Sequence, residues 1–349
     1  MSPNRKKIFK TLNPRKVLIP AGISIGFVVY MLLTDDNFSP QKLNLVFDGN
    51  AFALILAGFL LVIKEVAYIF RIKFLGEDEV TWSGSVYIIL LWEFASAVTP
   101  SVVGGTPVAV FLMMKEGINL GKSMAYAMIT AIFDNLYIVI FAPFLFIPFK
   151  EFLFTSTEND MWGAGLYAVF IISYSLIVGY TAIMIFAIFV RPRVFKWVMI
   201  KVTGIRFLRR WRYAAYQHGN EIMWASDELK SKKRHYWLKL SITTFVSWTA
   251  RFAMLNLMIM AFVDMGLLDH LIAFTKHMLL WIIMLASPTP GSSFAAEIGF
   301  AKLYELTLKE YTGAITILWR SFSYYPFLLI GAILLPKWIT RVFFQKKEV

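Results

Sequence analysis

The chain has 349 residues, of which 58% are apolar and 17% aromatic, and it contains no cysteine. This apolar share exceeds the roughly 45–50% of soluble domains, and the mean hydropathy is +0.63, so we predict a polytopic membrane protein. The lack of cysteine excludes disulfides, thiolate catalysis and cysteine-bound metal. Lys and Arg outnumber Asp and Glu by 35 to 22, which supplies a charge pattern for predicting topology.

Apolar segments long enough to cross a membrane recur along the whole chain. Because a span takes about 20 mostly apolar residues, the sequence predicts an all-α fold with about eight membrane segments. The first could be read as a secretory signal, but no small-residue cleavage site follows it, which favours a retained helix. The segments are 16–34, 51–72, 82–98, 123–148, 162–190, 237–263, 271–287 and 312–336.

Two apolar motifs rich in Pro and Gly interrupt these segments, VTPSVVGGTP over 98–107 and SPTPGSSFAAE over 287–297. A broken backbone at bilayer depth survives only when it is buried in protein or lines a polar cavity, and a pair of breaks in two halves indicates a transport site. Their glycines permit positive φ and close backbone approach. Helices expected to begin near Thr106 and Ser292 present N–H groups that bind anions. The candidate binding residues here are Thr99, Pro100, Gly104, Gly105, Thr106, Pro107, Pro288, Thr289, Pro290, Gly291 and Ser292.

The charge pattern predicts the orientation of the segments. Residues 5–16, 191–239 and 337–347 are rich in Lys and Arg, whereas 35–48, 151–160 and 264–270 are acidic or neutral. Basic segments stay in the cytoplasm, so both termini are predicted to be cytoplasmic. The first motif is then the bend of a hairpin that opens toward the cytoplasm, and the second is the bend of a hairpin that opens toward the outside. This predicts one transmembrane domain, 1–349, with inverted re-entrant hairpins in half-repeats 51–148 and 237–336. The alternative is that each motif is a tight turn outside the membrane between two full spans.

The loop 191–236 interleaves basic residues with Trp, Tyr and Phe. Such a composition beside a membrane favours interfacial helices that bind an anionic membrane surface. It can also indicate nucleic-acid binding, but the flanking spans argue against that. The alternative is a loop that only sets the topology.

Charged residues inside the predicted spans are costly in lipid and therefore mark candidate sites. Arg251 needs a partner from another helix. Arg320 lies in a segment with further polar side chains, and a guanidinium there can bind phosphate through two parallel hydrogen bonds, so we predict that Arg251 and Arg320 both hold phosphate. The alternative is that the arginines pair with carboxylates only to hold helices together. Lys64, Glu65 and Lys276 also lie in predicted spans, but Lys64 and Glu65 are adjacent rather than on one helix face. The candidates are Glu93, Asp134, Arg251, Glu297, Arg320 and Arg71, the last expected to snorkel to the inner interface.

The motifs resemble those of a known family. TPSVVGGTPVAVFLMMKEG, the Asp134 helix with TAIFDNLYI, and PTPGSSFAAE are similar to the transmembrane domain of lysylphosphatidylglycerol synthases and of stand-alone flippase-like proteins. This resemblance implies a multi-pass protein of the bacterial cytoplasmic membrane that moves or presents a phosphate-bearing lipid, without the separate synthase domain. The family motif maps onto Pro100, Gly104, Gly105, Pro107, Asp134, Pro288, Pro290, Gly291 and Glu297. Thr106, Ser292 and Phe294 depart from the family pattern, which implies a different headgroup.

We therefore predict a lipid flippase or lipid-handling transporter whose partners are a phospholipid, an anionic membrane surface and, as a further candidate, a second copy of the chain. An integral-membrane lipid-modifying transferase and a non-transporting partner of a lipid synthase are the alternatives. The sequence has no nucleotide-binding loop, no metal-ligand His pair and no nucleophile elbow. No cofactor, metal or catalytic residue is therefore expected, nor is nucleic acid as a partner.

Overall fold

The computed structural model describes residues 44–99, 105–154, 160–285, 287, 289 and 291–345. Within these ranges the secondary structure is helical, without a strand. Six helical segments are long and apolar enough to cross a membrane, and Trp82–Val98 is a shorter apolar helix. The prediction of an all-α polytopic membrane protein is confirmed, whereas the predicted segment 16–34 lies outside the described residues.

The first part of the chain consists of a long helix, a hairpin and a second long helix. These are α4 (Ala51–Gly76), the hairpin of α5 (Trp82–Val98) and α6 (Thr106–Glu116), and α7 (Leu120–Phe154), with η2 (Asn44–Asp48) before α4 and η3 (Glu77–Glu79) after it. The Asn50 side chain caps α4 by accepting hydrogen bonds from two backbone N–H groups. Thr81 caps α5 in the same way. The predicted helices at 51–72, 82–98 and 123–148 are confirmed as helices, and the two long ones extend further.

The middle of the chain forms a peripheral long helix and two shorter ones. Helix α8 (Asp160–Ile185) continues into the π-helix η5 (Phe186–Val190), and α9 (Pro192–Val202), η6 (Arg209–Trp211) and α10 (Arg212–Ser231) follow. Only one narrow stripe of α8 is buried, while apolar side chains such as Leu176 and Ile183 are each 68% exposed. An exposed apolar face of this kind suits contact with lipid rather than water.

The last part repeats the order of the first: α11 (Arg234–Met260), the hairpin of α12 (Leu267–Leu285) and α13 (Ser293–Leu308), η7 (Lys309–Tyr311), α14 (Thr312–Ser323), α15 (Tyr325–Thr340) and η8 (Arg341–Gln345). The prediction of one helix over 312–336 is wrong, because Tyr324 leaves the helical conformation with φ −131° and ψ −60°. The cause is Pro326, which lacks an N–H and whose ring clashes with the carbonyl four residues earlier.

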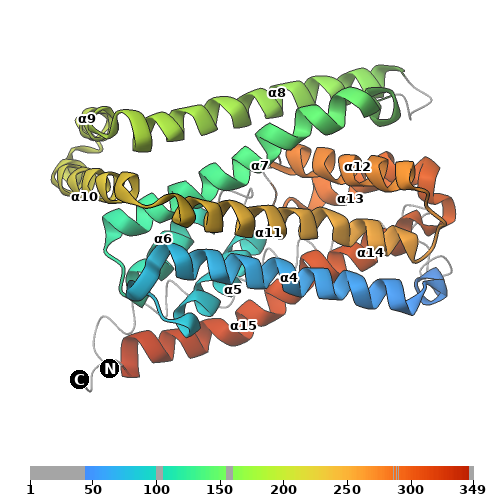
Figure 1. Cartoon of the computed structure of the whole chain (residues 1–349), viewed down its shortest axis with the longest axis horizontal. Coiled ribbons are helices and arrows are strands. Elements are labelled where there is room, and N and C mark those ends of the chain that lie inside the picture. The colour runs from blue at the N-terminus through green and yellow to red at the C-terminus, as the bar shows by residue number, and fades with distance from the viewer. Residues whose placement is uncertain are drawn as a thin grey trace.

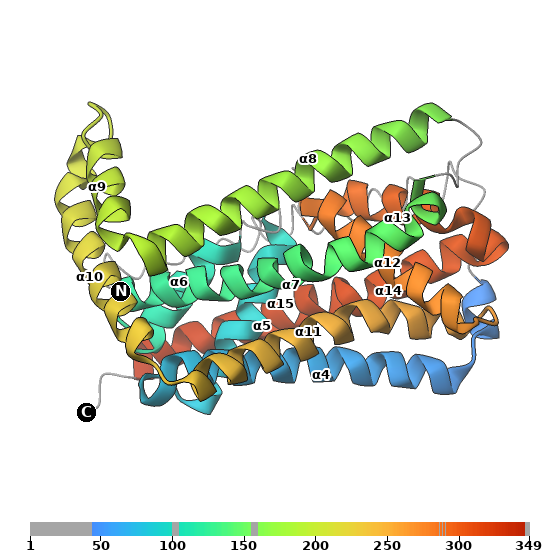
Figure 2. The same ribbon diagram turned by 45° about the horizontal axis from the view of Figure 1, so that its top comes forward.

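The two hairpins enter the bundle from opposite ends. Helices α4 and α11 lie side by side in both views (Figures 1 and 2). One end of the bundle, the α10 end, carries the ion pairs of Lys232 with Glu77 and of Lys122 with Glu79. At the other end, the η2 end, the backbone N–H of Asn50 donates to Ala261 at 2.8 Å. Hairpin α5–α6 starts and finishes at the α10 end, and hairpin α12–α13 at the η2 end (Figure 1).

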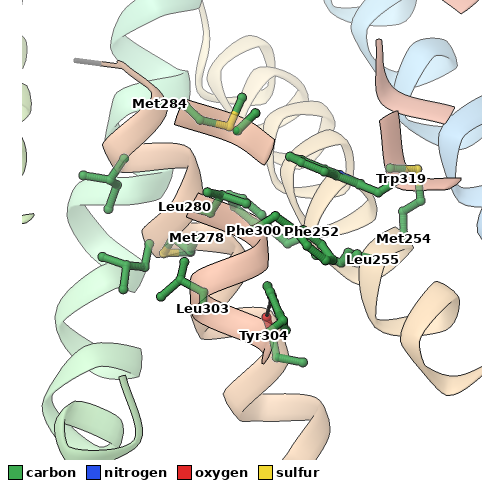
Figure 3. Packing of buried hydrophobic residues seen from close by; sticks show 14 of the residues in the cluster. Phe252, Met254, Leu255, Met278, Leu280, Met284, Phe300, Leu303, Tyr304 and Trp319 are labelled. Carbon is green, nitrogen blue, oxygen red and sulfur yellow. Dashed lines mark hydrogen bonds between the residues drawn. The ribbon is translucent and has the colours of Figure 1, made fainter. Parts of the chain in front are cut away.

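An aromatic and methionine-rich core holds the second hairpin in place. The Phe300 ring stacks on Tyr304, with centroids 4.7 Å apart, and on Trp319 at 5.3 Å. Around these rings pack side chains from α11 and α12, including Phe252 and Met278, as Figure 3 shows. A second core, which contains Leu91, Leu112, Ile129 and Trp338, joins α5, α6, α7 and α15.

Candidate functional site

A cavity of about 230 Å³, the central cavity, lies among α4, α5, α7, α11, α12, α14 and α15. The four Lys and Arg side chains that line it, called its basic side chains below, are Lys64, Arg71, Arg251 and Arg320. Aromatic side chains form much of the rest of its wall, namely Tyr68, Trp92, Trp248, Trp281, Trp319, Tyr324 and Phe327, and Tyr180 reaches it from α8. Such a cavity offers both charged groups and aromatic faces to a polar ligand.

The tips of the two hairpins meet beside this cavity at the break between α14 and α15. The Tyr324 hydroxyl donates to the carbonyl of Ala97, at the end of α5, at 3.2 Å. Gly291 lies against both, because an added Cβ would overlap the Tyr324 ring and lie 3.1 Å from the Ala97 oxygen. Arg320 donates to the Gly291 carbonyl at 3.5 Å. The chain at Ala97 and the chain at Gly291, almost 200 positions apart, therefore pack together against Tyr324.

The Asp134 carboxylate binds Arg71 in a bidentate pair. The Arg71 nitrogens Nη1 and Nη2 lie 2.5 and 3.1 Å from its two oxygens. The indole N–H of Trp248 donates to Asp134 at 2.7 Å, and Arg71 also donates to the Thr244 hydroxyl at 3.2 Å. The snorkelling predicted for Arg71 is wrong: its side chain is 3% exposed and points into the bundle, where a paired carboxylate offsets the cost of burying it.

The Glu93 carboxylate has two basic partners. Lys64 Nζ lies 3.0 Å from Glu93 Oε1, and Arg251 Nη2 lies 3.3 Å from the same oxygen. Arg251 also donates to the Tyr68 hydroxyl at 3.4 Å, while its Nε is buried without a hydrogen-bond partner. Lys64 contacts its neighbour Glu65 at 2.6 Å, so setting that pair aside because the two residues are adjacent was wrong. A lysine stem is long enough to bring its amine back to the next residue.

The third pair is the most deeply buried. Arg320 Nε lies 2.9 Å from Glu297 Oε1, and the two side chains are 4% and 2% exposed. The Arg320 guanidinium lies 4.0 Å from the centre of the Tyr324 ring. Thus all four basic side chains contact at least one carboxylate, and Glu65, Glu93, Asp134 and Glu297 balance the four positive charges.

The remaining predicted residues lie around the hairpin tips. Thr106 lines the cavity at the first turn of α6, Pro107 is exposed on that turn, and Thr99 donates to the Ala95 carbonyl at 2.7 Å. Thr289 and Ser287 share a hydrogen bond of 2.9 Å, and the buried Ser292 donates to the Met284 carbonyl at 2.8 Å. Pro100, Gly104, Pro288 and Pro290 lie outside the described residues.

Of the two described glycines in the motifs, one has the predicted positive φ, and both show the predicted close approach. Gly291 has a φ of +56° and sits in close contact with its neighbours, as predicted. Gly105 has a φ of −71°, so the prediction of positive φ is wrong there. The close approach predicted for Gly105 does hold, because an added Cβ would overlap the Ser96 side chain and lie 3.1 Å from the Ser96 backbone nitrogen.

Tyr68 and Trp248 were missed as candidate residues and Lys64 was set aside, although a signal for all three exists in the sequence. Positions i, i+4 and i+7 lie on one helix face, and Lys64, Tyr68 and Arg71 follow this spacing on α4. Thr244, Trp248 and Arg251 repeat it on α11. The two polar faces contact each other reciprocally, since each arginine donates to a hydroxyl of the other helix.

A separate charge cluster at the α10 end ties the middle of the chain to the bundle. Lys122 lies 2.5 Å from Glu79 and 3.0 Å from Glu228, and Lys232 lies 3.5 Å from Glu228. Burial raises the pKa of Glu228, but the hydrogen bond from Lys122 and the charges of both lysines outweigh it and hold that pKa below its usual range. This cluster is a structural clamp far from the cavity.

Comparisons with known proteins agree with this architecture. The family model described as lysylphosphatidylglycerol synthase TM region matches residues 17–331. A UPF0104 membrane protein of Archaeoglobus fulgidus is 25% identical over 346 residues, which cover 94% of this chain and 99% of that protein. No solved structure matches the chain significantly. The matched region includes both hairpins and every residue of the central cavity.

Proposed function

This chain belongs to the family of lysylphosphatidylglycerol synthase transmembrane regions, and on that basis and on its charged cavity we propose that it is a lipid flippase or related lipid-handling transporter. It acts in the bacterial cytoplasmic membrane and moves a lipid with a phosphate-bearing headgroup between leaflets. The headgroup binds in the central cavity while the acyl chains stay in the bilayer.

The observation that carries this proposal is the incomplete pairing of Arg251. A guanidinium has five N–H donors, yet among the described residues Arg251 makes two long hydrogen bonds, both from Nη2, whereas Arg71 makes three shorter ones at 2.5, 3.1 and 3.2 Å. Its side chain is 16% exposed, compared with 3% for Arg71 and 4% for Arg320. Arg251 lines the cavity, and its Nη1 makes no hydrogen bond among the described residues, so it keeps donors in the planar geometry that binds phosphate oxygens.

The carboxylates provide a way to bind and release an anion. Glu93 contacts both Lys64 and Arg251. A phosphate that binds Arg251 leaves Glu93 with Lys64, so no buried carboxylate loses its only counter-charge. The better paired Arg71 and Arg320 then serve mainly to position the helices around the site, and Thr106 and Gly291 bring the hairpin tips to the headgroup.

We further propose that both hairpins are re-entrant and inverted in the membrane, with the α10 end in the cytoplasm. Their opposite directions in the bundle and the basic loop 191–236 support this orientation. Exposed aromatic side chains on α9 and α10, such as Trp197 and Trp224, suit an anionic membrane surface. Single cysteines in this naturally cysteine-free chain test it: Asp78→Cys should react with an impermeant label only from the cytoplasm, and Glu310→Cys only from outside. Labelling of both from one side would contradict the inverted arrangement.

Liposomes that carry a fluorescent phospholipid test the function directly. We expect purified protein to speed the movement of the labelled lipid between leaflets. Arg251→Met should abolish this, and Arg251→Lys should restore little of it, because a point charge replaces a planar pair of donors. Arg193→Met, at an exposed arginine of α9, is the matched control and should behave as the wild type.

The same assay separates the alternatives. A chemically altered lipid would instead support a lipid-modifying transferase. Lipid that is neither moved nor altered would overturn the flippase proposal and favour a non-transporting partner of a lipid synthase.

A further inference from the structure

An ionisable side chain lies apart from the central cavity, between the two arms of hairpin α12–α13. Lys276 on α12 is 4% exposed. Its Nζ lies 3.5 Å from the Thr307 hydroxyl and 5.6 Å from the centre of the Tyr304 ring, both on α13. It does not line the cavity, and the proposed lipid site makes no use of it.

Lys276 differs from the four basic side chains of the cavity because it has no counter-charge. Among the described residues no carboxylate lies within ion-pair distance of it, and its printed side-chain contacts are with the Thr307 hydroxyl and the titratable Tyr304 ring on α13. The neighbouring His277 points elsewhere, with Nδ1 3.4 Å from the Phe252 carbonyl on α11. An unpaired ammonium in apolar surroundings is costly, so the charge on Lys276 depends on whether water reaches it.

The surroundings of Lys276 connect it to movement of the hairpin. The Ala273 carbonyl, one turn before Lys276 on α12, accepts a hydrogen bond of 2.7 Å from the Tyr304 hydroxyl on α13, and this bond holds the two arms together. Thr307, its hydrogen-bond partner, is exposed at the η2 end, which places a hydroxyl between the buried amine and the surface. A charge on Lys276 favours separation of the arms, because separation admits water to the ammonium. The same hairpin carries Gly291, which lines the central cavity, and Glu297, which pairs with the cavity-lining Arg320.

We propose that Lys276 is a proton-binding site that opens hairpin α12–α13 at the η2 end when it is protonated. A hydronium ion at that face transfers its proton to the neutral amine past Thr307 and leaves water, and closure of the hairpin returns the proton to water at the same face. This inference rests on the proposed lipid transport for its role, since it makes access to the headgroup site depend on pH, but the proton site itself can be tested independently.

Hydrogen exchange of the backbone measures the opening without any transport. When the pH is lowered from about 9 to about 6, protection factors of α13 residues near Thr307 should fall about tenfold in the wild type, beyond the intrinsic pH effect on exchange. Lys276→Met and Lys276→Gln should remove this dependence. The control is Lys302→Met on α13, where the lysine side chain is 52% exposed. This variant should retain the pH dependence of the protection factors. Equal pH dependence in the wild type and both Lys276 variants would overturn the inference, whatever the lipid assay shows.

The lipid assay then shows whether the proton site serves transport. Lipid movement in the wild type should increase several-fold when the η2 face is acidified, and Lys276→Met should move lipid at a rate independent of pH. If the backbone protection of α13 depends on pH but no lipid moves, the proton site is upheld and the flippase proposal is overturned. Lipid movement with the same pH response in wild type and Lys276→Met would overturn the coupling.

Discussion

Replacing Arg320 should destabilise the protein strongly, and a second substitution at Glu297 should reverse most of the loss. The two side chains are 4% and 2% exposed and lie 2.9 Å apart. Arg320→Met leaves the Glu297 carboxylate buried without an opposite charge, which costs about 3–5 kcal/mol of the free energy of unfolding. Replacing both groups with apolar side chains removes both charges, and such replacements of buried ion pairs are often neutral or stabilising.

A double-mutant cycle in mixed detergent micelles measures this coupling. The free energy of unfolding is compared for the wild type, Arg320→Met, Glu297→Leu and the double variant, and we expect a coupling energy of about 3 kcal/mol or more. Arg320→Lys should keep most of the stability, because it keeps the charge. Additive losses in the double variant would refute the reasoning that Arg320 and Glu297 form a structural pair.

The Lys variant also separates structure from substrate binding in the lipid assay. If Arg320 positions the hairpin, Arg320→Lys should move lipid nearly as fast as the wild type. If it binds phosphate through its planar fork, Arg320→Lys should be stable and yet lose most of the movement.

Three further outcomes are expected. Gly291→Ala should lower the free energy of unfolding by at least about 1–2 kcal/mol, because a φ of +56° is strained for alanine and the added Cβ displaces the Tyr324 ring. The control is Gly179→Ala on α8, where a Cβ meets open space, and a thermal melt should show no loss of stability for it. Asp134→Asn should cost about 3–5 kcal/mol by leaving Arg71 buried without its carboxylate, as read from the same detergent unfolding; a cost below about 1 kcal/mol would contradict the burial argument. Glu228→Gln should cost less than about 1 kcal/mol at neutral pH, since the side chain is 38% exposed. Because the pKa of Glu228 is lowered in the folded protein, its contribution is present above the usual glutamate value of about 4.3 and is lost as the pH falls below it, so melts of wild type and variant should converge in acid.

The amino-acid sequence was sufficient to predict the helical class and the positions of the hairpins. A span depends on about 20 consecutive apolar residues, and the breaks after Val98 and Leu285 depend on Pro and Gly within a few positions. Both are local properties of the chain. The break at Tyr324 is equally local, because Pro326 causes it, and attention to that proline would have corrected the predicted single helix.

The pairing of the charges was decided by the tertiary structure. The sequence indicated that Arg251 needs a partner from another helix, but Glu93, Asp134 and Glu297 were equivalent candidates along the chain. Arg71 and Asp134 are 63 positions apart, and Arg251 and Glu93 are 158 apart. Which carboxylate meets which arginine depends on the antiparallel packing of α4 against α11 and on the depth at which each hairpin turns. These are properties of the packed bundle, because the rotation and register of a helix are set by its neighbours and not by its own apolar content.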